Sequence, residues 1–140
     1  MASRPVPSSL VWLAAILLLA VCVTLVAGGA IYLETRAADE TRADAMTGGH
    51  SERGRAALYR HGCGTCHVIP GIDGANGMVG PDLTHVGQRA SLAGSLPNDP
   101  ETMVRWLMHP QALRPGSGMP EQGLSERQAR DIAAYLYARN

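Results

Sequence analysis

The stretch Cys63-Gly64-Thr65-Cys66-His67 decides how the rest of this sequence is interpreted. Two thiols three residues apart, followed at once by a histidine, form the attachment pattern of a c-type haem. Each thiol can add to one vinyl group of the porphyrin, and the histidine can then bind the iron as its proximal ligand. The pattern predicts one haem c, held covalently by Cys63 and Cys66 through two thioethers, with His67 as an iron ligand.

Two other chemistries use a cysteine pair at this spacing. A thioredoxin-like redox motif shares the C-x-x-C core, and a four-cysteine zinc site needs a second such pair. The only cysteine outside the motif, Cys22, lies in an apolar run, where we expect it to be a lipid-facing side chain. The remainder of the sequence has to separate these alternatives.

The apolar run covers residues 10–33 and contains no charged side chain. As a helix, 24 such residues would be about 36 Å long, enough to cross the hydrocarbon core of a membrane. The run is longer than the apolar part of a signal peptide, which is about 7–15 residues. We expect a polar arm at residues 1–9 and an uncleaved transmembrane anchor at 10–33. A signal cleaved near Gly28-Gly29-Ala30 is the alternative.

A solvated linker at residues 34–49 and one small domain at residues 50–140 are expected to follow the anchor. The linker is rich in Ala, Asp, Glu, Thr and Arg, can be helical in part close to the membrane, and ends in two glycines. The domain has nine arginines and eight acidic residues, so it is nearly neutral. Only 20 of its residues are Ile, Leu, Val, Met or Trp. Such a thin core favours a buried porphyrin, which would supply the missing apolar mass.

Helices are the expected elements of this domain, and its fold class is all-α. The first helix is predicted from an N-cap at Ser51 to about Arg60. It is expected to bury Ala57, Leu58 and Tyr59. No stretch alternates clearly enough to predict a strand, and residues 62–80, with six glycines, are expected to be a loop.

Two later helices carry start and stop signals. Asp99 is a capping residue with Pro100 at the first helical position, and Pro110 ends that helix. Residues 110–123 are expected to be a loop. The capping box Ser125-x-x-Gln128 opens the last helix. Its expected buried face is formed by Ala129, Ile132, Tyr135 and Leu136.

The ligand at the sixth position of the iron would separate electron transfer from ligand chemistry. Met119 is favoured, because it lies 52 residues after His67 in a loop framed by glycine and proline. Its thioether would raise the reduction potential. A hydrophobic plug in that loop is its alternative role. The other candidates are Met78, Met103, Met108, His50, His61, His85 and His109.

Three further residues are expected near the haem. The carbonyl of Pro81 can accept the Nδ1–H of His67 and orient the imidazole. Arg89 can pair with a propionate, or it can be a solvated loop residue. Trp106 is expected in the core, with its indole N–H near the ligand loop or a propionate.

Four segments give residues 50–140 a resemblance to the class I cytochrome c family. They are Cys63 to His67, Gly80-Pro81-Asp82-Leu83, Arg105-Trp106-Leu107 through Pro110 to Arg114-Pro115-Gly116-Ser117-Gly118-Met119-Pro120, and Asp131-Ile132-Ala133-Ala134-Tyr135-Leu136. The resemblance implies a small all-α fold around one haem. It also implies the proximal Pro81 carbonyl, Met119 as distal ligand and Arg89 on a propionate.

One detail departs from the family pattern. The family has a glycine four residues before an aromatic where the first and last helices cross, whereas Gly54 and Tyr59 are five residues apart. The residue that meets the last helix near Tyr135 therefore stays open.

A closer similarity is to the cytochrome c domain fused to subunit II of some bacterial haem–copper oxidases. The run Leu96-Pro97-Asn98-Asp99-Pro100-Glu101, leading into Arg105-Trp106-Leu107, carries it. We expect the haem domain alone on its own anchor, without the copper-binding domain of those subunits.

The function expected from these features is transfer of single electrons by a membrane-anchored monohaem cytochrome c. The resemblance implies a quinol–cytochrome c reductase as donor and a terminal haem–copper oxidase as acceptor. Because haem c is attached outside the cytoplasm, we expect a single-pass protein of the bacterial inner membrane, N-in, with a periplasmic haem domain. Two alternatives remain: a fixed subunit of a respiratory complex, and a haem sensor or peroxidase with a labile Met119. No enzyme activity, nucleic acid or small-molecule substrate is expected.

Overall fold

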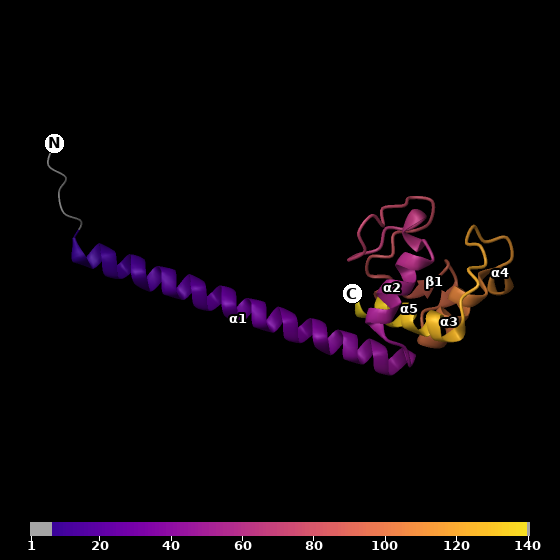
Figure 1. Ribbon diagram of the computed structural model, residues 1–140, viewed down its shortest axis with the longest axis horizontal. Coiled ribbons are helices and arrows are strands. Elements are labelled where there is room, and N and C mark those ends of the chain that lie inside the picture. The colour runs from indigo at the N-terminus through magenta and orange to yellow at the C-terminus, as the bar shows by residue number, and fades with distance from the viewer. Residues whose placement is uncertain (1–6, 140) are drawn as a thin grey trace. The chain divides into compact units, whose positions relative to one another are not determined.

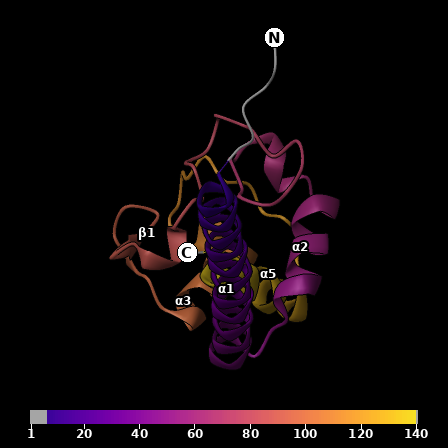
Figure 2. The same cartoon turned by 90° about the vertical axis from the view of Figure 1, so that its left-hand side faces the viewer.

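The computed structural model describes residues 7–139, and the chain divides into two compact units between Arg36 and Ala37. Most of the expected arm at residues 1–9 lies outside the described residues. The elements are helices apart from one very short hairpin, which confirms the all-α fold class (Figures 1 and 2). They are α1 (Ser8–Thr47), α2 (Ser51–Arg60), η1 (Cys63–Thr65), η2 (Val86–Gln88), β1 (Ser91–Leu92), β2 (Leu96–Pro97), α3 (Pro100–Met108), α4 (Pro110–Leu113) and α5 (Glu126–Ala138).

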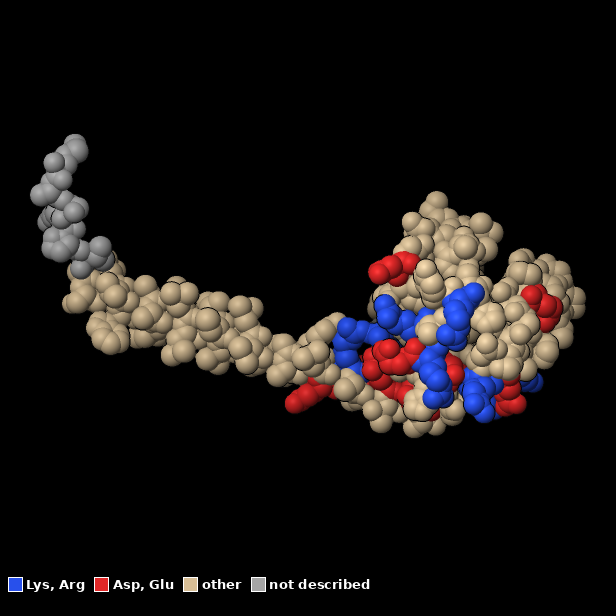
Figure 3. All heavy atoms as spheres, viewed as in Figure 1, with Lys and Arg blue, Asp and Glu red and all other residues tan. Residues whose placement is uncertain are grey.

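The first unit holds the apolar part of α1. This helix is long and apolar enough to cross a membrane, and none of its most apolar stretch is buried. Figure 3 shows the stretch without charged side chains. Cys22 is exposed on it, as the expected lipid-facing position requires.

The last turns of α1 differ from the solvated linker expected at residues 34–49. Residues 37–47 are helical and belong to the second unit. Ala43 and Thr47 are each only 1% exposed. The Thr47 carbonyl accepts a hydrogen bond from Arg130 Nη1 at 2.9 Å, and Arg139 pairs with Glu40 at 3.2 Å. Small side chains four residues apart let this helix pack closely, without the large apolar residues that would have revealed it.

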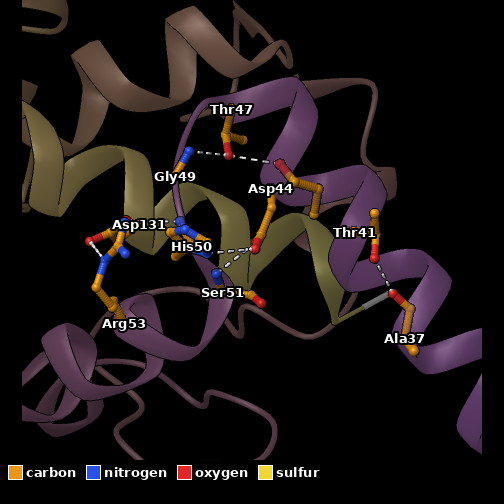
Figure 4. A network of polar contacts seen from close by, with 10 residues as sticks. Ala37, Thr41, Asp44, Thr47, Gly49, His50, Ser51, Arg53 and Asp131 are labelled. Atoms are coloured by element: carbon orange, nitrogen blue, oxygen red, sulfur yellow. Dashed lines mark hydrogen bonds and ion pairs between the residues drawn. The ribbon is translucent and has the colours of Figure 1, made fainter.

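The start of α2 depends on residues from both neighbouring helices (Figure 4). Asp44 Oδ1 accepts the Ser51 N–H at 2.7 Å, and Asp44 Oδ2 lies 3.0 Å from His50 Nδ1. Asp131 of α5 accepts the His50 N–H at 2.8 Å and pairs with Arg53 at 3.0 Å. The predicted N-cap at Ser51 is therefore wrong. His50 is the cap residue, and carboxylates from other helices satisfy the free backbone donors.

Helices α2 and α5 cross at Gly54, where the family pattern had left the contact open. A Cβ atom on Gly54 would overlap the Asp131 carbonyl and lie 3.0 Å from Tyr135 Cβ. Only glycine permits so close an approach of the two backbones. Gly54 is therefore the residue that meets α5 near Tyr135.

The buried face of α2 contains Ala57 and Leu58, as predicted, at 1% and 2% exposure. The prediction that Tyr59 is buried is wrong, since it is 73% exposed. Gly54, Ala57 and Leu58 lie at i, i+3 and i+4 on one helix face. Tyr59 comes one position later and points away from that face.

The signals for α3 and α5 are confirmed. Asp99 caps α3 by accepting the Thr102 N–H at 2.8 Å, and the helix ends at Met108, before Pro110. The capping box forms between Ser125 and Gln128.

The connecting segments contain several elements that the sequence pattern did not predict, among them α4 and the β1–β2 hairpin. The single turn α4 begins the stretch 110–123, which was expected to be loop throughout. Strands β1 and β2 pair with Ser91 opposite Pro97, but two residues each are too few to show alternation.

The predicted buried face of α5 is confirmed, since Ala129, Ile132, Tyr135 and Leu136 are each at most 4% exposed.

Replacing the α3 cap should destabilise the domain in a pH-dependent way. Hydrogen bonds from the Thr102 backbone N–H and hydroxyl hold the pKa of Asp99 below its ordinary value. This stabilisation is complete above the unfolded pKa of about 3.9 and is lost as the pH falls through the lowered folded pKa. We expect Asp99→Ala to cost about 1 kcal/mol at neutral pH, measured by urea unfolding.

The matched variant Asp99→Asn keeps an acceptor at the cap and removes the charge. It should retain most of the stability, and the Asp99→Ala deficit should shrink as the pH falls below the unfolded pKa of about 3.9 and through the lowered folded pKa. An Asp99→Ala deficit that is the same at both pH values would contradict the role assigned to the carboxylate.

Candidate functional site

A cavity of about 740 Å³ lies among α2, the loop 62–80, the β1–β2 hairpin, α3 and the loop before α5. Its size is typical of a site that encloses a small molecule or cofactor. Its apolar walls include Leu58, Leu83, Val86, Leu92, Met103, Leu107 and Leu136. The seven residues predicted to contact a haem also line it: Cys63, Cys66, His67, Pro81, Arg89, Trp106 and Met119. The fold thus brings together residues that lie up to 56 positions apart in the sequence.

The attachment stretch forms a tight turn at the end of α2. The 3₁₀ turn η1 begins at Cys63, and the Cys63 carbonyl accepts the His67 N–H at 3.1 Å. Cys63 and Cys66 are free cysteines, both partly buried. Burial raises the pKa of the Cys63 thiol, so this side chain stays protonated at neutral pH. The turn presents both thiols and the imidazole to the same cavity.

The orientation of His67 is set by the carbonyl of Pro81, which lies 2.7 Å from His67 Nδ1. A carbonyl can only accept, so Nδ1 carries the proton. The other ring nitrogen, Nε2, then has its lone pair available for a metal. This contact creates a ligand with a defined tautomer and direction.

Gly80 makes this contact possible. A Cβ atom at Gly80 would overlap the His67 ring. Its N–H donates to the Cys66 carbonyl at 2.8 Å, which holds the segment against the attachment turn. Gly80 does not have a left-handed φ angle. The position requires glycine because the backbone lies so close to the His67 side chain.

Met119 is held in a loop that Gln111 of α4 shapes. Gln111 Nε2 donates to the carbonyls of Ser117 and Met119, both at 2.7 Å. Gln111 Oε1 accepts the Gly116 N–H at 3.2 Å, and the Met119 N–H donates to Ser117 Oγ at 3.1 Å. Sequence reasoning missed Gln111, because nothing in a stretch expected to be loop indicates which side chain turns back on it.

The other candidates for the sixth position separate into two groups. Met103 and His61 also line the cavity. Met103 is 2% exposed within α3, and His61 Nε2 lies 3.2 Å from Gln128 Nε2. The described side chains that do not line the cavity are Met78, Met108, His50, His85 and His109. Met119 is the cavity methionine that lies in a loop.

Arg89 and Trp106 line the cavity from two different segments of the chain. Arg89 is exposed, and its Nη2 donates to the carbonyls of Asp82 and Thr84. Trp106 lies on α3 and is partly buried. Asn98, also missed from the sequence, donates to the Arg89 carbonyl at 2.6 Å and accepts from Tyr137 at 2.7 Å. Burial raises the pKa of Tyr137 to about 12, so this donor keeps its proton.

These residues fit an iron porphyrin. Two thiols and an imidazole with a free Nε2 come from one loop, a thioether comes from another, and arginines stand beside apolar walls. Cys63 and Cys66 would hold the porphyrin edge, and His67 and Met119 would bind the iron.

The chain belongs to the cytochrome c family, whose model matches residues 51–139. Proteins of this family bind haem and transfer electrons. The family therefore favours the haem interpretation of the cysteine pair over the zinc and thioredoxin-like alternatives.

Its curated relatives are subunits of a respiratory enzyme. The chain is 33% identical over 87 residues to cytochrome c oxidase subunit 2 of Alkalihalophilus pseudofirmus, and 30% identical over 84 residues to that of Bacillus sp. strain PS3. The matches cover 61% and 57% of this chain, but only 25% and 24% of the relatives. The chain thus spans about a quarter of the length of the curated relatives it matches. No solved structure gives a significant match.

Enlarging Gly80 should disturb the site. In Gly80→Ala the added methyl group collides with the His67 ring and displaces it from the Pro81 carbonyl. We expect a loss of about 1–3 kcal/mol in unfolding free energy, measured by denaturant unfolding of the purified protein. The haem content per chain, measured by absorbance, should also fall.

Gly118→Ala is the matched control, since Gly118 also lines the cavity but a Cβ there meets nothing within 4 Å. Equal behaviour of the two variants would show that the close approach at Gly80 is not required.

Proposed function

We propose that this chain is a membrane-anchored monohaem cytochrome c that passes single electrons in a respiratory chain. Cys63 and Cys66 would attach one haem c, and His67 and Met119 would bind its iron. The observation that carries the proposal is the 2.7 Å contact between His67 Nδ1 and the Pro81 carbonyl. It leaves His67 Nε2 free in the same cavity that Met119 lines.

The cofactor supplies a reversible one-electron couple of its iron when bound. The protein contributes ligands, orientation and exclusion of water. The Pro81 carbonyl keeps the His67 imidazole in one tautomer and direction. The soft thioether of Met119 favours the reduced iron. His67 and Met119 together would occupy the positions of the iron at which a substrate could bind, so the chain would act as a carrier and not as an enzyme.

Removing the proposed distal ligand tests this assignment. Met119→Ala should abolish the weak absorption band of the iron–methionine bond in the ferric protein and lower the midpoint potential, measured by redox titration. Met78→Ala is the matched control, because Met78 is 89% exposed and does not line the cavity. Met103→Leu, nearly equal in volume, should keep the band as well.

The outcome that would contradict the assignment is a band lost in Met103→Leu and kept in Met119→Ala. The same spectrum addresses the alternative of a haem sensor or peroxidase. A band that is intact in the wild-type ferric protein at neutral pH is incompatible with a methionine that yields to other ligands under these conditions.

The electron donor in this proposal is a quinol–cytochrome c reductase, and the acceptor is a terminal haem–copper oxidase. The names of the relatives support the association with an oxidase. Helix α1 supports an anchor, which we place in the bacterial inner membrane, N-in, with the haem domain on the periplasmic side.

A fixed subunit of an oxidase complex is the second candidate, and one structural observation favours it. Residues 37–47 are helical and packed on the haem domain through Ala43 and Thr47. Because these residues belong to the domain, the part of the chain that can act as a flexible linker is shorter than expected. The relatives are themselves oxidase subunits.

Isolation of the membrane complex separates the two candidates. After extraction in mild detergent, the carrier proposal expects the haem-stained band of this chain to migrate apart from the oxidase core subunits. Co-migration at a constant ratio through two chromatographic steps would instead establish a subunit. A haem-stained band of the mass of the full chain would also show that the anchor is retained.

A further inference from the structure

The cavity has a second arginine that the sequence did not assign. Arg114 precedes the Met119 loop, is exposed, and lines the cavity together with Arg89. In the loops 62–80 and 110–125 the charged residues are Asp73, Arg114 and Glu121, so Arg114 is their only base. Figure 3 shows that most charged atoms of this view lie below these loops, over the helices. Arg114 is thus a cation at the cavity in a part of the molecule that has few charged side chains.

The Arg114 guanidinium has no acceptor from the protein within residues 7–139. Its neighbour in the loop, Glu121, is used elsewhere: Oε1 accepts the Gln111 N–H at 3.1 Å, and Oε2 lies 3.6 Å from His109 Nδ1. Arg89 differs, because its Nη2 already donates to two backbone carbonyls. Arg114 therefore offers a complete, uncommitted set of donors at the cavity.

This guanidinium lies against the β1–β2 turn. A Cβ atom built on Gly94 would lie 2.8 Å from Arg114 Nη1, and Gly94 has φ +86°. The neighbouring Ser91 and Ala93 line the same cavity. The Arg114 side chain thus extends from the loop that carries Met119 to the hairpin turn on the other side of the cavity mouth.

A haem brings two propionates, and each carboxylate, once partly removed from water, is stabilised by a cation or a hydrogen-bond donor beside it. Arg89 alone supplies one. We infer that Arg114 is the second propionate-binding arginine, and that its contact fixes the Met119 loop against the β1–β2 turn. The inference rests on the haem function proposed above. A planar guanidinium suits this role, because it can donate two parallel hydrogen bonds to one carboxylate.

The link from Arg114 to the distal ligand is a short chain of hydrogen bonds. The Arg114 carbonyl accepts the Ser117 N–H at 3.1 Å, and Ser117 Oγ accepts the Met119 N–H at 3.1 Å. A propionate held by Arg114 would therefore restrain the backbone that positions the Met119 thioether. Arg114 acts as a positioning residue as well as a cofactor contact.

Three variants of the full chain, purified with haem, test this inference. Arg114→Gln removes the charge, Arg114→Lys keeps the charge but loses the fork, and Arg127→Gln is the control. Arg127 is an exposed arginine on α5 that does not line the cavity. The readouts are the midpoint potential, the propionate bending band in resonance Raman spectra and the iron–methionine absorption band.

We expect Arg114→Gln to lower the midpoint potential, because a positive charge beside the haem disfavours the ferric state. It should also shift the propionate band and weaken the iron–methionine band. Arg114→Lys should restore most of the potential while the propionate band stays shifted. Arg127→Gln should leave all three readouts as in the wild type.

A propionate band and potential in Arg114→Gln equal to those of Arg127→Gln would overturn the inference. If Arg114→Gln does not assemble with haem, Arg114→Lys decides, and an unshifted propionate band there overturns the inference too. Failure of the proposed function looks different, since the wild-type chain itself would then lack covalent haem or the iron–methionine band.

Discussion

The hydrogen bond between His67 and the Pro81 carbonyl is the contact on which the site depends. A histidine next to two cysteines is flexible and has two possible tautomers, and only a fixed acceptor makes one nitrogen a directed ligand. That acceptor is placed by Gly80, which lies against the imidazole where any side chain would collide with it. The loop 62–80 is thus shaped around one imidazole, and the cavity opens on its other side.

The packing of the helices brings this loop and other distant segments of the chain to one cavity. Helices α2 and α5 approach through Gly54, and Asp131 joins α5 to the start of α2 by accepting from His50 and Arg53. Several side chains of the buried core, among them Leu58, Met103 and Leu136, also line the cavity. A porphyrin would complete this core, so binding the cofactor and stabilising the fold are one physical event.

Features set by neighbouring residues could be predicted, whereas those set by distant residues could not. The caps at Asp99 and Ser125, the end of α3 before Pro110 and the inward face of α5 follow from local backbone requirements. The prediction for Tyr59 failed because the contact face of α2 was decided by the crossing at Gly54. The burial of Ala43 and Thr47 within the expected linker was not predicted, because these residues pack without any apolar pattern. Gln111 and Arg114 gave no signal, since their roles depend on loops that fold back across the cavity.

The sequence by itself determined the cofactor class, the apolar helix and the family. The C-x-x-C-H motif and the unbroken apolar run are each formed by neighbouring residues, so their chemistry can be recognised without the fold. Only the tertiary structure decided that Arg89, Arg114 and Met119, the last in a loop shaped by Gln111, share one cavity, and that residues 37–47 belong to the same compact unit. The physical reason is that these contacts join segments tens of residues apart. Their geometry exists only once α2, α3 and α5 have packed.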